Sequence, residues 1–213
     1  MRKLALLGGL FFLVTAFMQS ATAEDVFRYN YVQGAYQSIS IDMRGSADKL
    51  TASAPAVTGS YALNDMIALQ ASAGLVSESF STPGYTLDAS GTIMGLGASL
   101  HTGITDNVEI GLDLGRSVLD LNKYTVNGID QPTFKSYSSD ASANVRVAIT
   151  PELLLGASVG HAISNSDTGS GPGYSVNAEY YIGKSFGIGG AYSISHSSEG
   201  YTRGITIGAR YYF

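Results

Sequence analysis

The sequence predicts an all-β fold, a transmembrane antiparallel up-and-down β-barrel of ten strands. Three observations lead to this fold class. Apolar residues alternate with small or polar ones along most of the chain, and the connections between these runs are short and long in turn. No run after residue 23 approaches the roughly 20 apolar residues that a membrane helix needs. The 26 glycines, 14 tyrosines and 14% charged residues suit strands better than a helical bundle or a disordered chain.

The first 23 residues have the pattern of a secretory signal peptide. Arg2 and Lys3 precede an apolar run over residues 4–18, and Ala21-Thr22-Ala23 fits the cleavage site. We expect a signal peptide over residues 1–23 and a barrel domain over residues 24–213. An uncleaved N-terminal anchor is the alternative.

Charge and cysteine content exclude several classes of partner and site. Without the signal peptide, 10 basic residues remain against 17 acidic ones, so the net charge is −7 and nucleic acid is not an expected partner. The chain has no cysteine, which excludes disulfides and thiolate metal sites. The three histidines lie far apart in the sequence, and we expect neither a metal site nor a cofactor.

The alternation is clearest in residues 201–213. The odd positions are mostly apolar with aromatic ends and the even ones are small or polar, as in a strand between lipid and lumen. The first run of the chain is ambiguous, because Ile39 and Ile41 disagree with the register set by Val32 and Tyr36. The same period of two predicts strands at 28–41, 56–63, 66–76, 91–104, 107–119, 137–149, 152–163, 174–182 and 185–196.

Tight and long connections alternate along the chain. The tight ones are 63–65, 104–107, 149–152 and 182–185, and the longer ones are 42–55, 77–90, 120–136, 164–173 and 196–200. Outer-membrane barrels have short periplasmic turns and longer extracellular loops, which puts both termini in the periplasm. Eight strands is the alternative count, because the run at 56–63 is weak.

A soluble β-sandwich also alternates and is the competing fold. The face that would form its core carries Glu109, Asp113, Arg146, Glu179 and Arg210. Such charges are costly in an apolar core and are compatible with a wet barrel lumen. The apolar face also ends in aromatic residues, as membrane-facing strands do. The barrel therefore accounts for the sequence better than the sandwich.

Three short segments resemble small Gram-negative outer-membrane β-barrel proteins of the OmpA/OmpX type. They are residues 29–36 (YNYVQGAY), 62–65 (ALND) and 209–213 (ARYYF). The resemblance implies localisation in the cell outer membrane and contact with its lipid and lipopolysaccharide. It also implies assembly by periplasmic chaperones and the barrel-assembly machinery, with Tyr211 and Phe213 of the last strand as the assembly signal. The family contains pores, structural proteins, adhesins and a few enzymes, so the function stays open.

Charged residues on the predicted lumen face form the first candidate site. This lumen charge network consists of His101, Glu109, Asp113, Arg146, Glu179 and Arg210. Strand register places most of them in the half of the lumen near the tight turns and allows Arg210 to meet Glu179. One interpretation is a set of opposite charges that satisfy one another, and the other is a constriction that selects ions. The small residues on the lumen face leave room for a narrow water path.

Two arginines form a candidate lipid site on the outside of the barrel. Arg116 and Arg203 are expected to face outward near the outer rim, where a guanidinium group can contact lipopolysaccharide phosphates. Snorkelling of these long side chains at the membrane edge is the alternative.

Catalytic motifs are incomplete, and we expect no catalytic residues. His196-Ser197-Ser198-Glu199 resembles the His-x-Ser of outer-membrane lipid A deacylases, but no acid follows on the matching face of the next strand. Omptin-type proteases need paired acids and a His–Asp couple. The available residues, Asp120, Asp130, Asp140, Asp167 and His161, form no recognisable constellation of that kind.

The sequence thus predicts a non-enzymatic outer-membrane barrel with a structural or surface role and a possible narrow pore for ions or small solutes. The alternative is an adhesin or surface-binding barrel that acts through its extracellular loops, with 77–90 and 120–136 presenting the surface. The extracellular ligand is not identified by the sequence. A lipid A-modifying hydrolase is the third interpretation.

Overall fold

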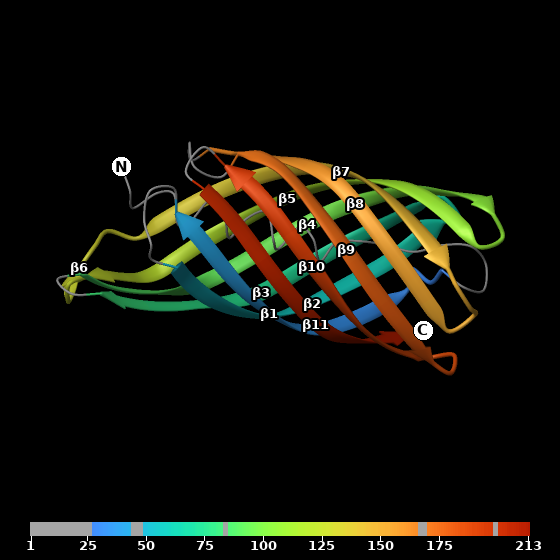
Figure 1. Ribbon diagram of the computed structural model, residues 1–213, viewed down its shortest axis with the longest axis horizontal. Helices are drawn as coiled ribbons and strands as arrows, with labels where there is room; N and C mark the ends of the chain where they lie inside the picture. Colours follow the sequence, from blue (N-terminus) through green and yellow to red (C-terminus); the bar gives the residue numbers. More distant parts are fainter. Residues whose placement is uncertain (1–26, 44–48, 83–84, 166–169, 198–199) are drawn as a thin grey trace.

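The computed structural model describes residues 27–43, 49–82, 85–165, 170–197 and 200–213, and every regular element in these ranges is a β-strand (Figure 1). The expected signal peptide lies outside the described residues. Ten long antiparallel strands and one short strand, β6, follow one another along the chain. They are β1 (Tyr31–Met43), β2 (Lys49–Asn64), β3 (Ile67–Thr82), β4 (Tyr85–Thr105), β5 (Val108–Val126), β6 (Ile129–Asp130), β7 (Phe134–Ala148), β8 (Leu153–Ser164), β9 (Gly171–Ile182), β10 (Phe186–Ser197) and β11 (Gly200–Tyr212).

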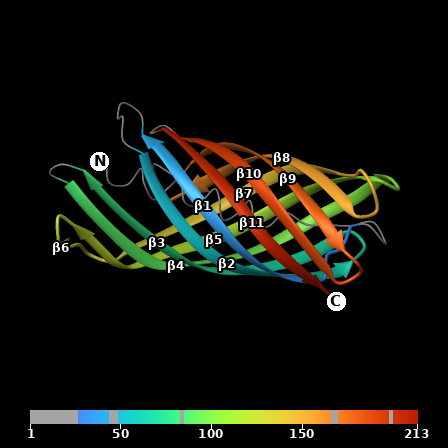
Figure 2. The same cartoon turned by 60° about the horizontal axis from the view of Figure 1, so that its bottom comes forward.

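The long strands close into a ten-stranded barrel, as predicted. Each pairs with its neighbours in the sequence, and β1 closes the ring by pairing with β11 from Tyr31↔Tyr212 to Met43↔Gly200 (Figure 2). The short β6 pairs with β5 alone and lies at the tip of an extension of the barrel wall. The weak run at 56–63 belongs to β2, so the alternative of eight strands is wrong. Within the described ranges, no helix has the length and apolar character needed to cross a membrane.

The two ends of the barrel differ. The turn end holds the connections β2–β3, β4–β5, β7–β8 and β9–β10, and the chain passes through it on entering β1 and on leaving β11. The opposite end, the loop end, carries the β6 extension. Two of the long connections predicted for this end, 77–90 and 120–136, are mostly strand: β3 ends at Thr82, β4 starts at Tyr85, and β5 runs to Val126. The predicted connection 42–55 is likewise strand from Lys49 onward.

The outer surface of the barrel carries an apolar band. Exposed side chains such as Val57, Leu96, Leu114, Val176 and Ile207 point outward from every part of the ring. Aromatic residues flank this band, as in transmembrane barrels. Near the turn end they are Tyr61, Tyr180, Phe186, Tyr211 and Phe213, and toward the loop end they are Tyr137, Tyr174, Tyr192 and Tyr201.

The polarity of the two faces inverts at the loop end. In β1 the lumen side carries Gln33 and Gln37 and then Ile39 and Ile41, which are 0% and 4% exposed. The strand keeps one register throughout, so the ambiguity in the sequence reflects a change of polarity along the lumen. Outward positions become polar over the same stretch, for example at Ser38. The prediction of loops over these residues is wrong, because strand pairing continues beyond the point at which the outer face stops being apolar.

Candidate functional site

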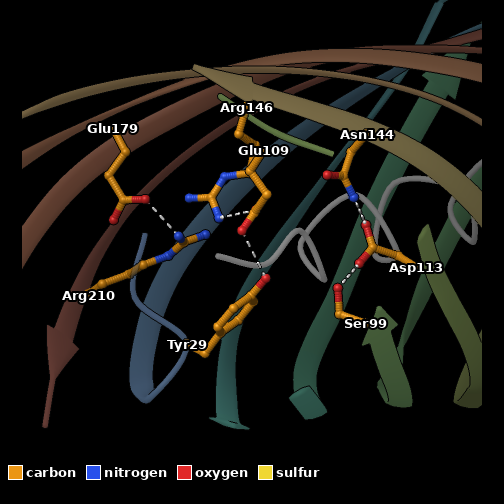
Figure 3. Close-up of polar contacts among 8 residues, drawn as sticks. All are labelled: Tyr29, Ser99, Glu109, Asp113, Asn144, Arg146, Glu179 and Arg210. Carbon is orange, nitrogen blue, oxygen red and sulfur yellow. Dashed lines mark hydrogen bonds and ion pairs between the residues drawn. The ribbon is translucent and has the colours of Figure 1, made fainter. Parts of the chain in front are cut away.

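The lumen holds the charged residues, and their strands place them at several levels (Figure 3). Nearest the turn end, Arg210 Nη1 lies 2.7 Å from Glu179 Oε2, and Arg210 Nε donates to Gln33 Oε1 at 2.7 Å. The Tyr212 hydroxyl donates a hydrogen bond to the other oxygen of Glu179. The ring of Tyr31 lies 4.5 Å from the Arg210 guanidinium carbon. This arginine is therefore held by a carboxylate, an amide and an aromatic face.

A second ion pair connects β5 and β7 on the lumen side. Glu109 and Arg146 are direct cross-strand partners on β5 and β7, and Arg146 Nη1 lies 3.7 Å from Glu109 Oε1. Both side chains are almost fully buried. The Tyr29 hydroxyl donates to Glu109 Oε2 at 3.4 Å, and the Tyr29 ring stacks on His101 with ring centroids 3.7 Å apart. Four predicted lumen residues thus belong to two ion-paired clusters, and His101 joins the second through Tyr29.

Asp113 is the centre of a separate hydrogen-bonded group. Asn144 Nδ2 donates to Asp113 Oδ2 at 2.6 Å, and the Ser99 hydroxyl donates to Oδ1 (Figure 3). These side chains come from three adjacent strands, β4, β5 and β7. The carboxylate is satisfied by neutral donors, as buried carboxylates require.

Glycines on the lumen face provide the space for these long side chains. A Cβ on Gly187 would lie 2.7 Å from Glu179 Oε1, and one on Gly208 would lie 2.8 Å from Gln33 Nε2. The small residues of the sequence suggested an unfilled lumen. At these two positions the space beside the glycine is taken by a polar side chain from a neighbouring strand.

Residues 27–30 cross the mouth of the barrel at the turn end, an arrangement that the sequence pattern does not indicate. Arg28 Nη1 donates to the carbonyl oxygens of Lys184 and Gly183, at 2.6 and 3.3 Å, in the β9–β10 turn. Tyr29 reaches β4 and β5 on the other side, as described above. Asn30 Oδ1 accepts from the Ala62 N–H of β2 at 2.8 Å. The sequence predicts a first strand from residue 28, whereas the strand in fact begins at Tyr31.

Phe27 continues this closure into the lumen. It is buried in a cluster with Ala68, Ala148 and Leu154, and its ring lies 5.3 Å from the guanidinium carbon of Arg146. The segment 27–30 therefore touches both the apolar and the charged side chains at the turn end.

The loop end of the lumen holds an apolar cluster. It is formed by Ile39, Ile41, Ala52, Val76, Leu87, Ala89, Ile93, Leu119 and Leu121, with Tyr124 and Phe134 packed against it. These side chains come from β1 to β5 and β7, so the cluster extends over more than half of the ring. The cluster is not predicted by the sequence pattern, and the ambiguous register at Ile39 and Ile41 is its only signal there.

The two arginines predicted near the rim lie on the outer surface. Arg116 is exposed on β5. Arg203 is also outward-facing, and its Nη2 lies 2.8 Å from Asp42 Oδ2 on β1. Tyr211 and Phe213 are exposed at the turn end, where Tyr211 packs edge to face on Phe186 and the Phe213 N–H donates to the Asn30 carbonyl at 3.2 Å.

The candidate catalytic residues are dispersed. His196 contacts the rings of Tyr174 and Tyr201, with centroids 6.3 and 4.7 Å apart, and Ser198 and Glu199 lie outside the described residues. Asp120 forms an ion pair with Lys135, whereas His161 points outward on β8. Asp167 also lies outside the described ranges. Among the described residues, no group of three or more His, Cys, Asp and Glu side chains is arranged to hold a metal ion.

Two solved structures share this fold. The translocator domain of the autotransporter NalP from Neisseria meningitidis has a TM-score of 0.59 at 12% identity, covering 98% of this chain and 95% of that chain. The COG4313 outer membrane channel from Pseudomonas putida F1 has a TM-score of 0.54 at 12% identity, covering 91% and 97%. At such identities the similarity concerns the fold alone. The search of curated proteins finds no match. The family model of the outer membrane protein beta-barrel domain matches residues 9–213, and the chain therefore belongs to this family of outer-membrane barrels.

Proposed function

We propose that this protein is a closed outer-membrane barrel with a structural or surface role and no enzymatic activity. Its turn end and both termini lie in the periplasm, its loop end lies outside the cell, and residues 1–23 are removed on export. Tight turns at one end and an extended wall at the other support this orientation, because outer-membrane barrels keep short turns on the periplasmic side.

The apolar cluster at the loop end is the observation that carries the proposal. In the membrane part of the wall, apolar side chains face outward, whereas at the loop end Ile39, Leu119 and Leu121 face inward and are fully buried. Inward apolar and outward polar residues are the arrangement of a water-soluble β-protein. The wall beyond the membrane is thus built as a packed platform, which suits presentation of a surface better than conduction.

The outer surface of this platform is polar, and hydrogen bonds connect neighbouring strands on it. Ser79 Oγ donates to Asp88 Oδ1 at 2.7 Å between β3 and β4. At the tip, Asn127 and Gly128 have φ angles of 53° and 74°, which an Asn-Gly hairpin turn requires. The Asn127 N–H donates to the Thr86 carbonyl at 2.8 Å, and the Thr86 N–H donates to Asn127 Oδ1 at 2.7 Å. A surface partner would meet this hydrogen-bonded tip, in place of the extracellular loops that the sequence suggested.

A narrow ion path is the second candidate function. The specific observation in its favour is the two buried ion pairs, Arg210–Glu179 and Arg146–Glu109, since rings of charged side chains select ions in pores. Against it stand the segment 27–30 at one mouth and the apolar cluster at the other.

Conductance in planar bilayers separates the two candidates. The mature barrel is expected to give no discrete conductance steps. Steps whose cation-to-anion selectivity changes in Arg210→Gln would establish the pore and contradict the closed barrel. As a matched control, Arg203→Gln removes an arginine of the same strand that points outward, and it should leave any selectivity unchanged.

Two contacts with other molecules follow from the family and from the placement of exposed residues. We infer that Tyr211 and Phe213 are recognised by the barrel-assembly machinery, with periplasmic chaperones acting before insertion. Arg116 and Arg203 would contact lipopolysaccharide phosphates at the outer rim. Their exposure on the outer surface supports this role, because a guanidinium group binds phosphate through two parallel hydrogen bonds.

A further inference from the structure

Pairing between β2 and β3 is interrupted where the apolar band ends, on the side of the loop end. Pairing runs from Ala62↔Ala68 to Ala56↔Gly74 and resumes at Ser53↔Ser77. Among the described residues of these two strands, Ala54 and Pro55 have no partner between those points. Both residues still pair with β1 on their other side. The interruption is therefore local to one seam of the barrel.

Pro55 is the physical cause of the interruption. Its carbonyl oxygen lies 3.1 Å from the position of a Cβ on Gly74, so its peptide groups are directed at β3. The N–H and C=O of one strand residue point to the same neighbouring strand, and proline has no N–H to donate. Proline is confined almost entirely to edges and bulges of sheets, yet Pro55 lies inside a closed wall. One backbone hydrogen bond between β2 and β3 is thus missing at this point, because proline has no N–H.

An apolar groove of about 430 Å³ opens at this interruption. Some of its lining residues face the membrane, namely Gly34, Pro55, Val57, Ala73, Leu75 and Met94. Others, Ala35, Ala56, Gly74 and Ile93, occupy lumen-facing positions of the same strands. The groove therefore opens on the outer surface, and its floor is the wall itself. Ile93 belongs to the apolar cluster of the loop end and is only 1% exposed, so its side chain closes the floor of the groove on the lumen side.

We propose that this groove is a lateral binding site for the acyl chain of a membrane lipid. The exposed residues beside it, Val57, Leu75 and Met94, belong to the apolar band, so lipid hydrocarbon is the material in contact with it. The groove lies where the apolar band ends, since the next outward residues along β2 and β3 are Ser53 and Ser77. A chain entering there comes from the leaflet at the loop end. The site holds the chain by apolar burial alone, and the lipid headgroup stays outside the wall.

Photocrosslinking in liposomes tests the proposal. The full mature barrel is reconstituted with phosphatidylcholine that carries a diazirine in the middle of one acyl chain, and labelled residues are mapped by mass spectrometry. Ala56 and Gly74 on the floor of the groove should be labelled along with outward Val57 and Leu75, whereas buried Ile93 should not. Labelling confined to outward residues would show ordinary annular lipid and would overturn the proposal. Crosslinks between groove residues of two barrels would assign the groove to a second copy and would also overturn it.

Two glycines supply a matched pair of variants. A Cβ added at Gly34 or at Gly59 would meet no atom within 4 Å, and both glycines lie on the outward face, but only Gly34 lines the groove. Gly34→Leu fills the groove from the lipid side, and excluding about two methylenes should lower Gly74 labelling about tenfold. Gly59→Leu should leave it unchanged. Equal labelling of Gly74 in both variants would contradict an acyl-chain site at Pro55.

Discussion

Arg210 and Glu179 meet inside the barrel although β10 separates their strands, with Arg210 Nη1 2.7 Å from Glu179 Oε2. Gly187 and Gly189 of β10 lie between them: Gly187 pairs with Arg210, and Gly189 pairs with Glu179. Because these glycines have no side chain, the guanidinium and the carboxylate reach across the intervening strand. The contact therefore depends on three strands: β9 and β11 supply the charges, and the glycines of β10 leave the space between them.

Removing one partner of this pair should be costly. Glu179→Leu leaves Arg210 buried without its carboxylate, which costs about 3–5 kcal/mol in the free energy of unfolding. The double variant Glu179→Leu/Arg210→Met should recover most of that loss, because both charges are then absent. Urea unfolding of the barrel in lipid vesicles measures each value. A double variant as unstable as the single one would show that the loss comes from packing and not from the unpaired charge.

Gly187→Ala should destabilise the barrel through the same contact. The added methyl would lie 2.7 Å from Glu179 Oε1 and 3.2 Å from Tyr212 Cε2, and overpacking of this kind costs about 1–3 kcal/mol. Gly59→Ala is the control, since a Cβ there meets nothing within 4 Å. The midpoint of urea unfolding should fall for Gly187→Ala only. Equal midpoints would mean that the Glu179 carboxylate moves aside at no cost.

The sequence predicts most of the membrane-spanning part of this fold. The features that it does not predict lie at the two ends of the barrel. Within the band, the period of two gives strand number, closure and the lumen placement of Arg210 and Glu179. At the loop end the period persists but its polarity inverts, as at Ile39 and Ile41, so the pattern predicts loops where strands continue. The segment 27–30 crosses the mouth of the barrel, which the sequence pattern does not indicate. Its contacts with the Lys184 carbonyl and Glu109 depend on strands that only the closed ring brings near.

Leu119→Ala should loosen the loop end and leave insertion intact. Truncating a fully buried leucine costs about 2–5 kcal/mol locally, and local opening exposes backbone to proteases. Leu114→Ala, on the same strand but facing outward, is the matched control. Limited proteolysis of intact vesicles should cut β3–β7 faster in Leu119→Ala alone. Identical cleavage rates for the two variants would contradict a packed core at this end.

Deleting Phe213 should impair assembly into the outer membrane. The expected result is less heat-modifiable, folded barrel in outer-membrane fractions, because the aromatic end of β11 is the proposed assembly signal. Ile207→Ala changes an outward residue in the middle of the same strand and should assemble normally. Unassisted folding into detergent should be the same for both variants. Normal assembly of the barrel without Phe213 would show that this residue is not an assembly signal.

The reactivity of single introduced cysteines tests the closed loop end most directly. Because the chain has no cysteine of its own, each variant carries a single thiol. Ile41→Cys places a thiol in the apolar cluster, and Ser79→Cys places one on the exposed outer surface. With a water-soluble maleimide, Ile41→Cys should react about a hundredfold more slowly, since labelling must wait for local opening. Equal rates at the two positions would mean that water reaches the lumen from the loop end, and the account of a closed barrel would be wrong.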